Sequence, residues 1–226
     1  SLAGMDMPGF GYGINYDYGL FKQLIVNGYQ KEAPDYWPNR SSPWLISRFG
    51  EKCMVPVYGR IVDTKDSNGD YNPVWHDWQL IVGRAHDVLI SGYGGGTVNR
   101  LRLFSAWAST SFDIRIFNDG DYFKAVEDKI KSETISKILY PSDTKEAGKE
   151  LRLLQEYFLV SCSVQDIIRI FLKDHDNFDK FPQKVAIQLN DTHPALTVAE
   201  LMRALIDQQG LEWEKAWEIT TATLGY

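Results

Sequence analysis

The sequence lacks a basic run and a long apolar segment, and each absence argues against a class of partner. Its formal net charge is −6, and it has no cluster of lysines and arginines that could neutralise a phosphate backbone. We therefore expect no nucleic-acid partner. No stretch approaches the roughly 18 apolar residues that span a bilayer, and the first residues lack the basic start and apolar core of a signal peptide. We therefore expect no membrane partner and a cytoplasmic location.

Cysteine is also scarce, with Cys53 just before a strand-like run and Cys162 inside an apolar helical pattern. These different surroundings favour two reduced thiols, as in a cytoplasmic protein. No cysteine and histidine spacing is typical of zinc, so we expect no metal site. The sequence also lacks a nucleophile elbow, a phosphate-binding Gly-Lys-Ser loop and a His-Glu-x-x-His helix, which excludes the self-contained signatures of common hydrolases, kinases and metalloproteases.

Apolar and aromatic side chains, by contrast, are abundant. Hydrophobic residues make up 44 % of the 226 residues and aromatic residues 13 %. This composition predicts a globular protein with a sizeable core. Aromatic rings also form the surfaces on which sugars stack, but most rings fill cores, and their number alone leaves both uses open.

Residues 1–120 are predicted to form a mixed strand and loop region. The alternating glycines of 9–13 indicate a strand entering a turn, and because no helix signal follows, they are not a dinucleotide-binding motif. The aromatic, proline-punctuated residues 14–52 indicate irregular surface structure packed by large rings.

Strand signals follow that irregular region. The runs Val55–Val62 and Val74–Val82 flank the turn-rich residues 66–70 and predict a hairpin with a long loop. Alternation at residues 100–103 predicts a further strand that carries its arginines on one face.

Residues 121–226 are predicted to contain two long helices and a strand-helix unit. The first helix is expected from Tyr122 to Leu139, and its polar middle suggests that it projects into solvent or crosses to a partner subunit. Apolar residues spaced three and four apart from Leu151 to Phe171 predict a buried core helix.

The strand-helix unit is expected to begin with a strand at Val185–Leu189. The helix after it has Thr197 and Glu200 at capping-box spacing and Gly210 where a C-terminal cap belongs. A last helix is expected to start at residues 212–217.

Asp191 and His193 follow the end of the expected strand at Val185–Leu189. Doubly wound α/β sheets bind ligands at the carboxyl ends of their strands, so these side chains are candidates for a binding site. Together with Asp143, which follows a helix, they offer the directional donors and acceptors that a neutral polyhydroxylated ligand needs. A local interpretation competes, in which residues 190–192 form only a turn and helix entry and His193 is a surface histidine.

Four segments resemble the α-glucan phosphorylases, a family that includes the glycogen, starch and maltodextrin phosphorylases. The segments are GYGINYDYGLF at 11–21, LYPSD at 139–143, GKELRLLQEYF at 148–158 and AIQLNDTHP at 186–194. The resemblance covers nearly the whole chain, and the last two segments are highly specific.

This resemblance implies an α/β fold that forms part of the N-terminal Rossmann-like domain of a two-domain GT-B-type glycosyltransferase, with a β-rich insertion. The whole of 1–226 is then an incomplete N-terminal domain of a longer enzyme. Members of the family transfer a terminal glucosyl unit from an α-1,4-glucan to inorganic phosphate with retention, giving glucose 1-phosphate. Their pyridoxal 5′-phosphate is held by a lysine of the C-terminal half, so we expect no cofactor-binding residue here.

The same resemblance suggests roles for particular residues. Asp191 and His193 resemble the pair that hydrogen-bonds the acceptor side of the glucan. Asp143, with its neighbours Ser142 and Thr144, resembles the mobile gate loop that contacts the glucose unit and controls the access of phosphate. No catalytic residue is assigned in this chain, and the segment alone is expected to be inactive.

Assembly and regulation are also suggested by the resemblance. The helix at 122–137 resembles the tower helix that packs against a twofold mate, which implies a homodimer. Animal members grip an activating nucleotide with adjacent arginines, but here only Arg169 matches and Ile170 replaces the second. The loop at 172–181 is also short, so we expect no nucleotide activation.

Two other functions remain open at the level of sequence. One is a non-catalytic carbohydrate-binding or dimerisation module. The other is a nucleotide-sugar glycosyltransferase with the same two-domain architecture, against which the phosphorylase motifs argue.

Overall fold

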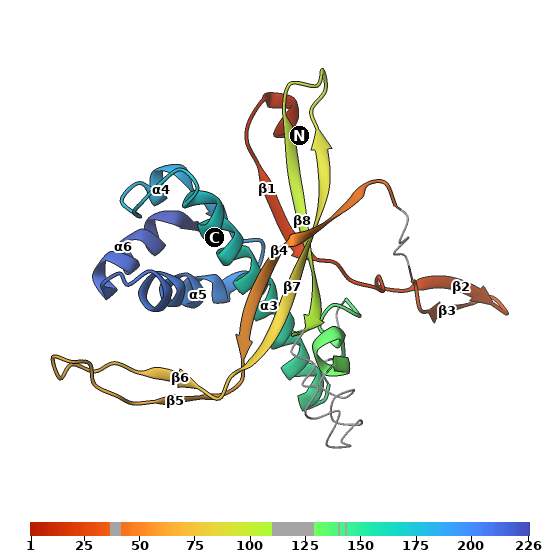
Figure 1. Ribbon diagram of the computed structural model, residues 1–226. Helices are drawn as coiled ribbons and strands as arrows, with labels where there is room; N and C mark the ends of the chain where they lie inside the picture. Colours follow the sequence, from red (N-terminus) through yellow and green to blue (C-terminus); the bar gives the residue numbers. More distant parts are fainter. Residues whose placement is uncertain (37–41, 110–128, 140, 143) are drawn as a thin grey trace.

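A computed structural model describes residues 1–36, 42–109, 129–139, 141–142 and 144–226 (Figure 1). Its centre is a four-stranded sheet in the order β1 (Phe10–Ile14), β8 (Val98–Ala108), β7 (Gln79–Ser91) and β4 (Leu45–Val57). β1 runs parallel to β8, whereas β8, β7 and β4 are antiparallel neighbours. The sheet is therefore mixed, and with the helices it confirms the α/β class.

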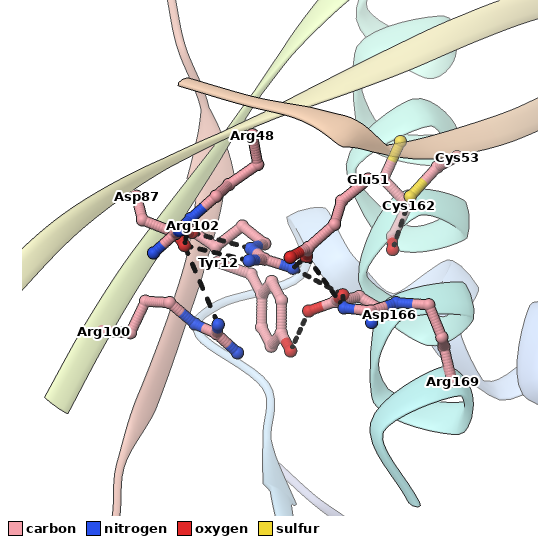
Figure 2. Close-up of polar contacts among 10 residues, drawn as sticks. All are labelled: Tyr12, Arg48, Glu51, Cys53, Asp87, Arg100, Arg102, Cys162, Asp166 and Arg169. Atoms are coloured by element: carbon pink, nitrogen blue, oxygen red, sulfur yellow. Dashed lines mark hydrogen bonds and ion pairs between the residues drawn. The ribbon is translucent and has the colours of Figure 1, made fainter. Parts of the chain in front are cut away.

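The hairpin with a long loop is confirmed and is larger than the sequence indicated. β4 and β7 each contain 13 residues, and beyond them the short strands β5 (Arg60–Val62) and β6 (Val74–His76) pair antiparallel. The pairing of β4 with β7 shifts register between Arg48 and Lys52. Beside this bulge, Glu51 reaches Arg169 of the helix that covers the sheet (Figure 2).

The prediction of irregular structure throughout 14–52 was wrong in part. β2 (Lys22–Val26) and β3 (Tyr29–Ala33) form an antiparallel hairpin that projects from the body of the molecule (Figure 1). Its turn is Asn27-Gly28, with φ of 54° and 81°, and both values suit the tight turn whose twist matches paired strands. Packing by large rings is confirmed only in part, because Tyr18 and Tyr36 contact each other whereas Tyr29 and Trp44 are 79 % and 77 % exposed.

The buried core helix is confirmed as α3 (Glu146–Phe171), which belongs to two hydrophobic cores. Phe158 and Cys162 face the sheet and pack with residues such as Val55 and Phe104. Val164 and its apolar neighbours face the opposite way, toward the C-terminal helices. α3 thus joins the sheet to the helical layer, as Figure 1 shows.

The strand-helix unit at the C-terminal end is present, with a shorter strand than predicted. β9 contains only Ile187–Gln188 and pairs parallel with β10 (Leu224–Gly225). Between them lie a 3-10 turn at His193–Leu196, α5 (Thr197–Arg203), a π-helical turn at Ala204–Gln208 and α6 (Trp213–Thr223). The short helix α4 (Phe181–Lys184) precedes β9.

The predicted ends of the helix after β9 have different outcomes. The capping box is wrong, because the hydroxyl of Thr197 donates to the carbonyl of Pro194 and Glu200 forms an ion pair with Arg203. The chain enters α5 through the 3-10 turn, which places Thr197 inside the helical segment. Gly210 is confirmed as the terminator, since its φ is 70° and its N–H donates to the carbonyl of Ile206.

The helix expected from Tyr122 to Leu139 is described only from residue 129 onward. Residues 129–134 are helical, but 135–137 form a turn and Ile138 makes a parallel bridge with Tyr18, so the helix ends before Leu139. Residues 122–128 lie outside the described part of the chain. Within the described residues, no helix is both long and apolar enough to cross a membrane.

Candidate functional site

Asp191 and His193 lie where the sequence placed them, just after the carboxyl end of a strand with a parallel partner. The N–H of Leu189 donates to the carbonyl of Gly225 at 2.8 Å, which extends the pairing of β9 with β10 up to this turn. Asp191 has a φ of 65°, a left-handed conformation that aspartate tolerates better than most residues. The backbone therefore reverses here and leads directly into the turn that contains His193.

The side chain of Asp191 is exposed and is held by its own turn. Its Oδ1 accepts a hydrogen bond from the Thr192 N–H at 2.6 Å. This backbone hydrogen bond is the main cause that lowers the pKa of Asp191, and the nearby His193 contributes in the same direction. The local interpretation of the turn is confirmed to this extent, while the exposed carboxylate keeps capacity for further hydrogen bonds.

His193 is joined to the core helix. Its Nδ1 lies 3.1 Å from Oε1 of Glu156, in the third turn of α3. The two side chains are 38 % and 28 % exposed, so the contact is partly shielded from water. Two segments of the phosphorylase-like pattern, 148–158 and 186–194, thus meet in space.

The predicted gate residues lie just before the N-terminal end of α3. Ser142 and Thr144 are exposed, and their hydroxyl oxygens are 3.0 Å apart, just before the helix begins at Glu146. Asp143 lies outside the described residues. Glu156 is ten residues farther along α3, which corresponds to roughly 15 Å of helix. The structure describes no contact that links Ser142 or Thr144 with Asp191 or His193.

Four consecutive residues of α3 contact four different parts of the molecule. The buried amide of Gln155 donates to the carbonyls of Ile135 and Ile138 at 3.0 and 2.9 Å. Glu156 contacts His193, and Phe158 is buried in the sheet core. Tyr157 lies beside Glu200 of α5, and burial together with this carboxylate raises the pKa of its phenol to about 12. This segment, residues 155–158, fixes the His193 turn relative to the rest of the fold.

A buried cluster of charges lies between the sheet and α3, and the sequence prediction of site residues did not include it. Arg102 of β8 is 1 % exposed and donates to both carboxylate oxygens of Asp87, at 2.7 and 2.9 Å (Figure 2). Its second described partner is Asp166 of α3, at 2.6 Å, and Glu51 from the bulge of β4 forms an ion pair with the same guanidinium. The alternating arginines at 100–103 were the signal for this cluster.

The cluster is extended by three further arginines and a tyrosine. Arg48 and Arg100 also pair with Asp87, Arg169 pairs with Glu51 and Asp166, and the phenol of Tyr12 donates to Asp166 at 2.9 Å. These contacts are drawn together in Figure 2. Four guanidinium groups thus surround three carboxylates. In this arrangement the buried charges are paired with opposite charges, and α3 makes polar contacts with β1, β4 and β8.

The pKa directions follow from these contacts. Burial opposes the charged form of Asp87, but the hydrogen bonds from Arg102 and Arg48 outweigh it and hold the pKa of Asp87 below its usual range. Burial and the adjacent Asp166 carboxylate raise the pKa of Tyr12, which stays a neutral hydrogen-bond donor.

Beside the cluster lies a hollow of about 470 Å³, whose charged lining includes Glu51, Arg102, Asp166 and Arg169.

The described residues do not fit a covalent pyridoxal phosphate site or a metal site. The cofactor needs a sheltered lysine, whereas the lysines of the described residues are exposed except for Lys137 and Lys215, which are partly buried and paired with aspartates. No group of three or more histidine, cysteine, aspartate or glutamate side chains in the described part of the chain is arranged to hold a metal ion.

Comparison with known proteins identifies the family. All of residues 1–226 match the model of the carbohydrate phosphorylases. The chain is 49 % identical to glycogen phosphorylase of Chlamydia pneumoniae, 46 % identical to that of Synechocystis and 45 % identical to the brain form of Mus musculus. Each match covers 100 % of this chain and 27 % of the relative, so the chain spans about a quarter of the length of these curated relatives. The chain belongs to the carbohydrate phosphorylase family.

Proposed function

We propose that this chain is a segment of an α-1,4-glucan phosphorylase, which transfers terminal glucosyl units to inorganic phosphate and releases glucose 1-phosphate. The observation that carries the proposal is the family match over the whole chain, together with 44 to 49 % identity to proteins named glycogen phosphorylase. In this proposal the segment forms part of the N-terminal Rossmann-like domain of a GT-B-type enzyme. Its mixed sheet and the parallel β9–β10 pair are compatible with that assignment.

Within the proposal, Asp191 and His193 bind the acceptor side of the glucan. Both follow the carboxyl end of a strand, and the exposed Asp191 carboxylate offers acceptors to sugar hydroxyls. Ser142, Asp143 and Thr144 form the gate. Ser142 and Thr144 are exposed at the start of α3, where a change in the loop need not disturb the buried core.

The cofactor and the assembly are further parts of the proposal. Pyridoxal 5′-phosphate belongs to the full-length enzyme, and its phosphate group supplies proton transfer to the substrate phosphate. We propose that a lysine outside this segment holds it. The segment 122–137, for which the sequence predicts a helix, packs against a second subunit in a homodimer.

The decisive experiment measures phosphorolysis by the full-length protein. Purified protein is incubated with maltodextrin and inorganic phosphate, and glucose 1-phosphate is quantified, while absorbance records bound pyridoxal phosphate. We expect phosphate-dependent product and one cofactor per polypeptide. Binding of glucan without product, in a protein without the cofactor, would instead indicate a carbohydrate-binding module and overturn the proposal.

A further inference from the structure

Glu156 contacts a proposed substrate-binding residue but has no role in the proposed function. Its Oε1 lies 3.1 Å from Nδ1 of His193, and the two residues are 37 positions apart in the sequence. The contact is partly shielded from water on both sides. It is therefore a tertiary contact between α3 and the turn after β9.

The chemistry of imidazole gives this contact a consequence. A neutral ring has a hydrogen on one nitrogen only, and a carboxylate beside Nδ1 favours the tautomer in which Nδ1 carries the hydrogen and donates it. Nε2 then carries the lone pair and can accept a hydrogen bond from a hydroxyl group. The carboxylate also restricts rotation of the ring, as it does for histidines that bind metals.

Glu156 itself projects from a part of α3 that is fixed by its neighbours. Gln155 is buried and donates to the carbonyls of Ile135 and Ile138, while Phe158 is fully buried against the sheet. The turn at Asp191, in contrast, is exposed. Sites supported by helices are held more precisely than sites on loops, so α3 provides the rigid reference for the His193 ring.

We infer that Glu156 is a positioning residue for His193, which sets the tautomer and orientation of the ring that receives a glucan hydroxyl. The glucan part of this inference rests on the proposed function. Glu156 does not touch substrate and acts only through His193.

The first test is spectroscopic and does not depend on activity. Full-length protein carrying ¹⁵N-labelled histidine is examined by NMR at a pH where the ring is neutral, and the His193 signals are assigned by their loss in His193→Ala. We expect the Nδ1–H tautomer to predominate in the parent protein and in Glu156→Gln, whose amide oxygen still accepts. Glu156→Ala should shift the ring toward the Nε2–H form, and an unchanged tautomer in this variant would overturn the inference.

The second test is kinetic. Loss of an orienting hydrogen bond to a charged group should raise the KM for glucan about tenfold in Glu156→Ala, with kcat and the KM for phosphate changed less than about twofold. Glu156→Gln should recover most of the loss. Glu218→Gln is the matched control, because it removes the same charge from an exposed position on α6.

The two tests separate this inference from the proposed function. Equal losses in Glu156→Gln and Glu156→Ala would reject the role of the acceptor oxygen. If His193→Ala leaves the KM for glucan unchanged, the proposed glucan contact fails, while the tautomer still decides whether Glu156 positions the ring. Thermal unfolding identifies any variant that has lost its fold. If Glu156→Ala is such a variant, the tautomer measured in Glu156→Gln decides whether the acceptor oxygen positions the ring.

Discussion

At the scale of single residues, Arg102 links α3 to the sheet through two carboxylates. It is almost fully buried and pairs with Asp87 and Asp166, which are themselves 0 % and 3 % exposed. Removing one partner of a buried pair leaves an uncompensated charge, which costs far more than the pair itself contributes.

Arg102→Met should therefore destabilise the protein by about 3–5 kcal/mol, because Asp87 and Asp166 lose their central partner. The loss is measured by hydrogen exchange of the β7 and β8 amides in the full-length protein. Arg60→Met is the control, since its pair with Asp77 is exposed and should contribute no more than about 1 kcal/mol. Equal protection of these amides from hydrogen exchange in Arg102→Met and Arg60→Met would contradict this role of Arg102.

The lowered pKa of Asp87 predicts acid sensitivity in the same region. A carboxyl group with a lower pKa in the folded state stabilises the fold above its unfolded-state value, near pH 4, and this contribution is lost as the pH falls through the folded value. Protection of the β7 and β8 amides should thus decline below about pH 4. Asp87→Asn should have a flatter pH profile, and an equally steep decline would show that other groups are responsible.

At the proposed substrate site, Asp191→Asn and His193→Ala are expected to raise the KM for glucan more than the KM for phosphate. One lost hydrogen bond to a sugar corresponds to a change of about tenfold. Steady-state kinetics of the full-length enzyme with each substrate varied in turn provide the measurement. Unchanged dependence on glucan in both variants would remove these residues from the site.

The sequence was sufficient to place Asp191 and His193 but not their surroundings. Their position after a strand follows from local chemistry, because an apolar run ends at a turn-forming segment and a proline. Glu156 was missed because its contact with His193 joins two distant segments and depends on how α3 packs. For the same reason, the arginines of β8 were predicted to share a face while their carboxylate partners were not identified.

At the scale of elements, α3 and β7 approach so closely that one glycine is required between them. A Cβ atom added at Gly83 would lie only 2.4 Å from Sγ of Cys162. With any larger residue at position 83, either the Cys162 side chain or the helix would have to move, so the present packing of α3 on the sheet depends on Gly83.

Gly83→Ala is accordingly expected to destabilise the protein by about 1–3 kcal/mol through overpacking. Cys162→Ala in the same protein should recover part of this loss, because it removes the atom that clashes. Gly50→Ala is the control, since a Cβ atom there would meet no atom within 4 Å. Urea denaturation of the four variants provides the comparison, and strictly additive effects of Gly83→Ala and Cys162→Ala would contradict the clash.

The elements differ in how well their sequences predicted them. α3 was found because apolar residues recur at helical spacing from Leu151 to Phe171, and β8 because residues 100–103 alternate. The β2–β3 hairpin was missed although Asn27-Gly28 is a strong hairpin signal, since the surrounding aromatic residues and prolines favoured irregular structure. The capping box failed because the chain enters α5 through a 3-10 turn instead of a free N-terminus.

At the scale of the whole molecule, the ion pairs of Arg169 affect whether a nucleotide could activate the enzyme. Its guanidinium already pairs with Asp166 and Glu51, and Ile170 follows it, at the position where the family resemblance implies a second arginine in animal members. A nucleotide phosphate would have to displace two carboxylates and would find one arginine instead of two.

AMP should therefore change the rate of phosphorolysis by the full-length enzyme by less than about twofold, since the nucleotide has little interaction energy to shift a conformational equilibrium. The assay compares initial rates at subsaturating phosphate with and without AMP. A large activation would refute the prediction. Ile170→Arg, which places two arginines next to each other, is tested for activation by AMP in the same assay.

The segment 155–158 has a consequence for the length of α3. Each residue of a helix advances its direction by about 100°, so deleting or inserting one residue before this segment would rotate all four side chains together. Gln155 would turn away from the carbonyls that it binds, Glu156 from His193 and Phe158 from the sheet. Substitutions here remove one contact at a time, whereas a change of a single residue in length would remove them all.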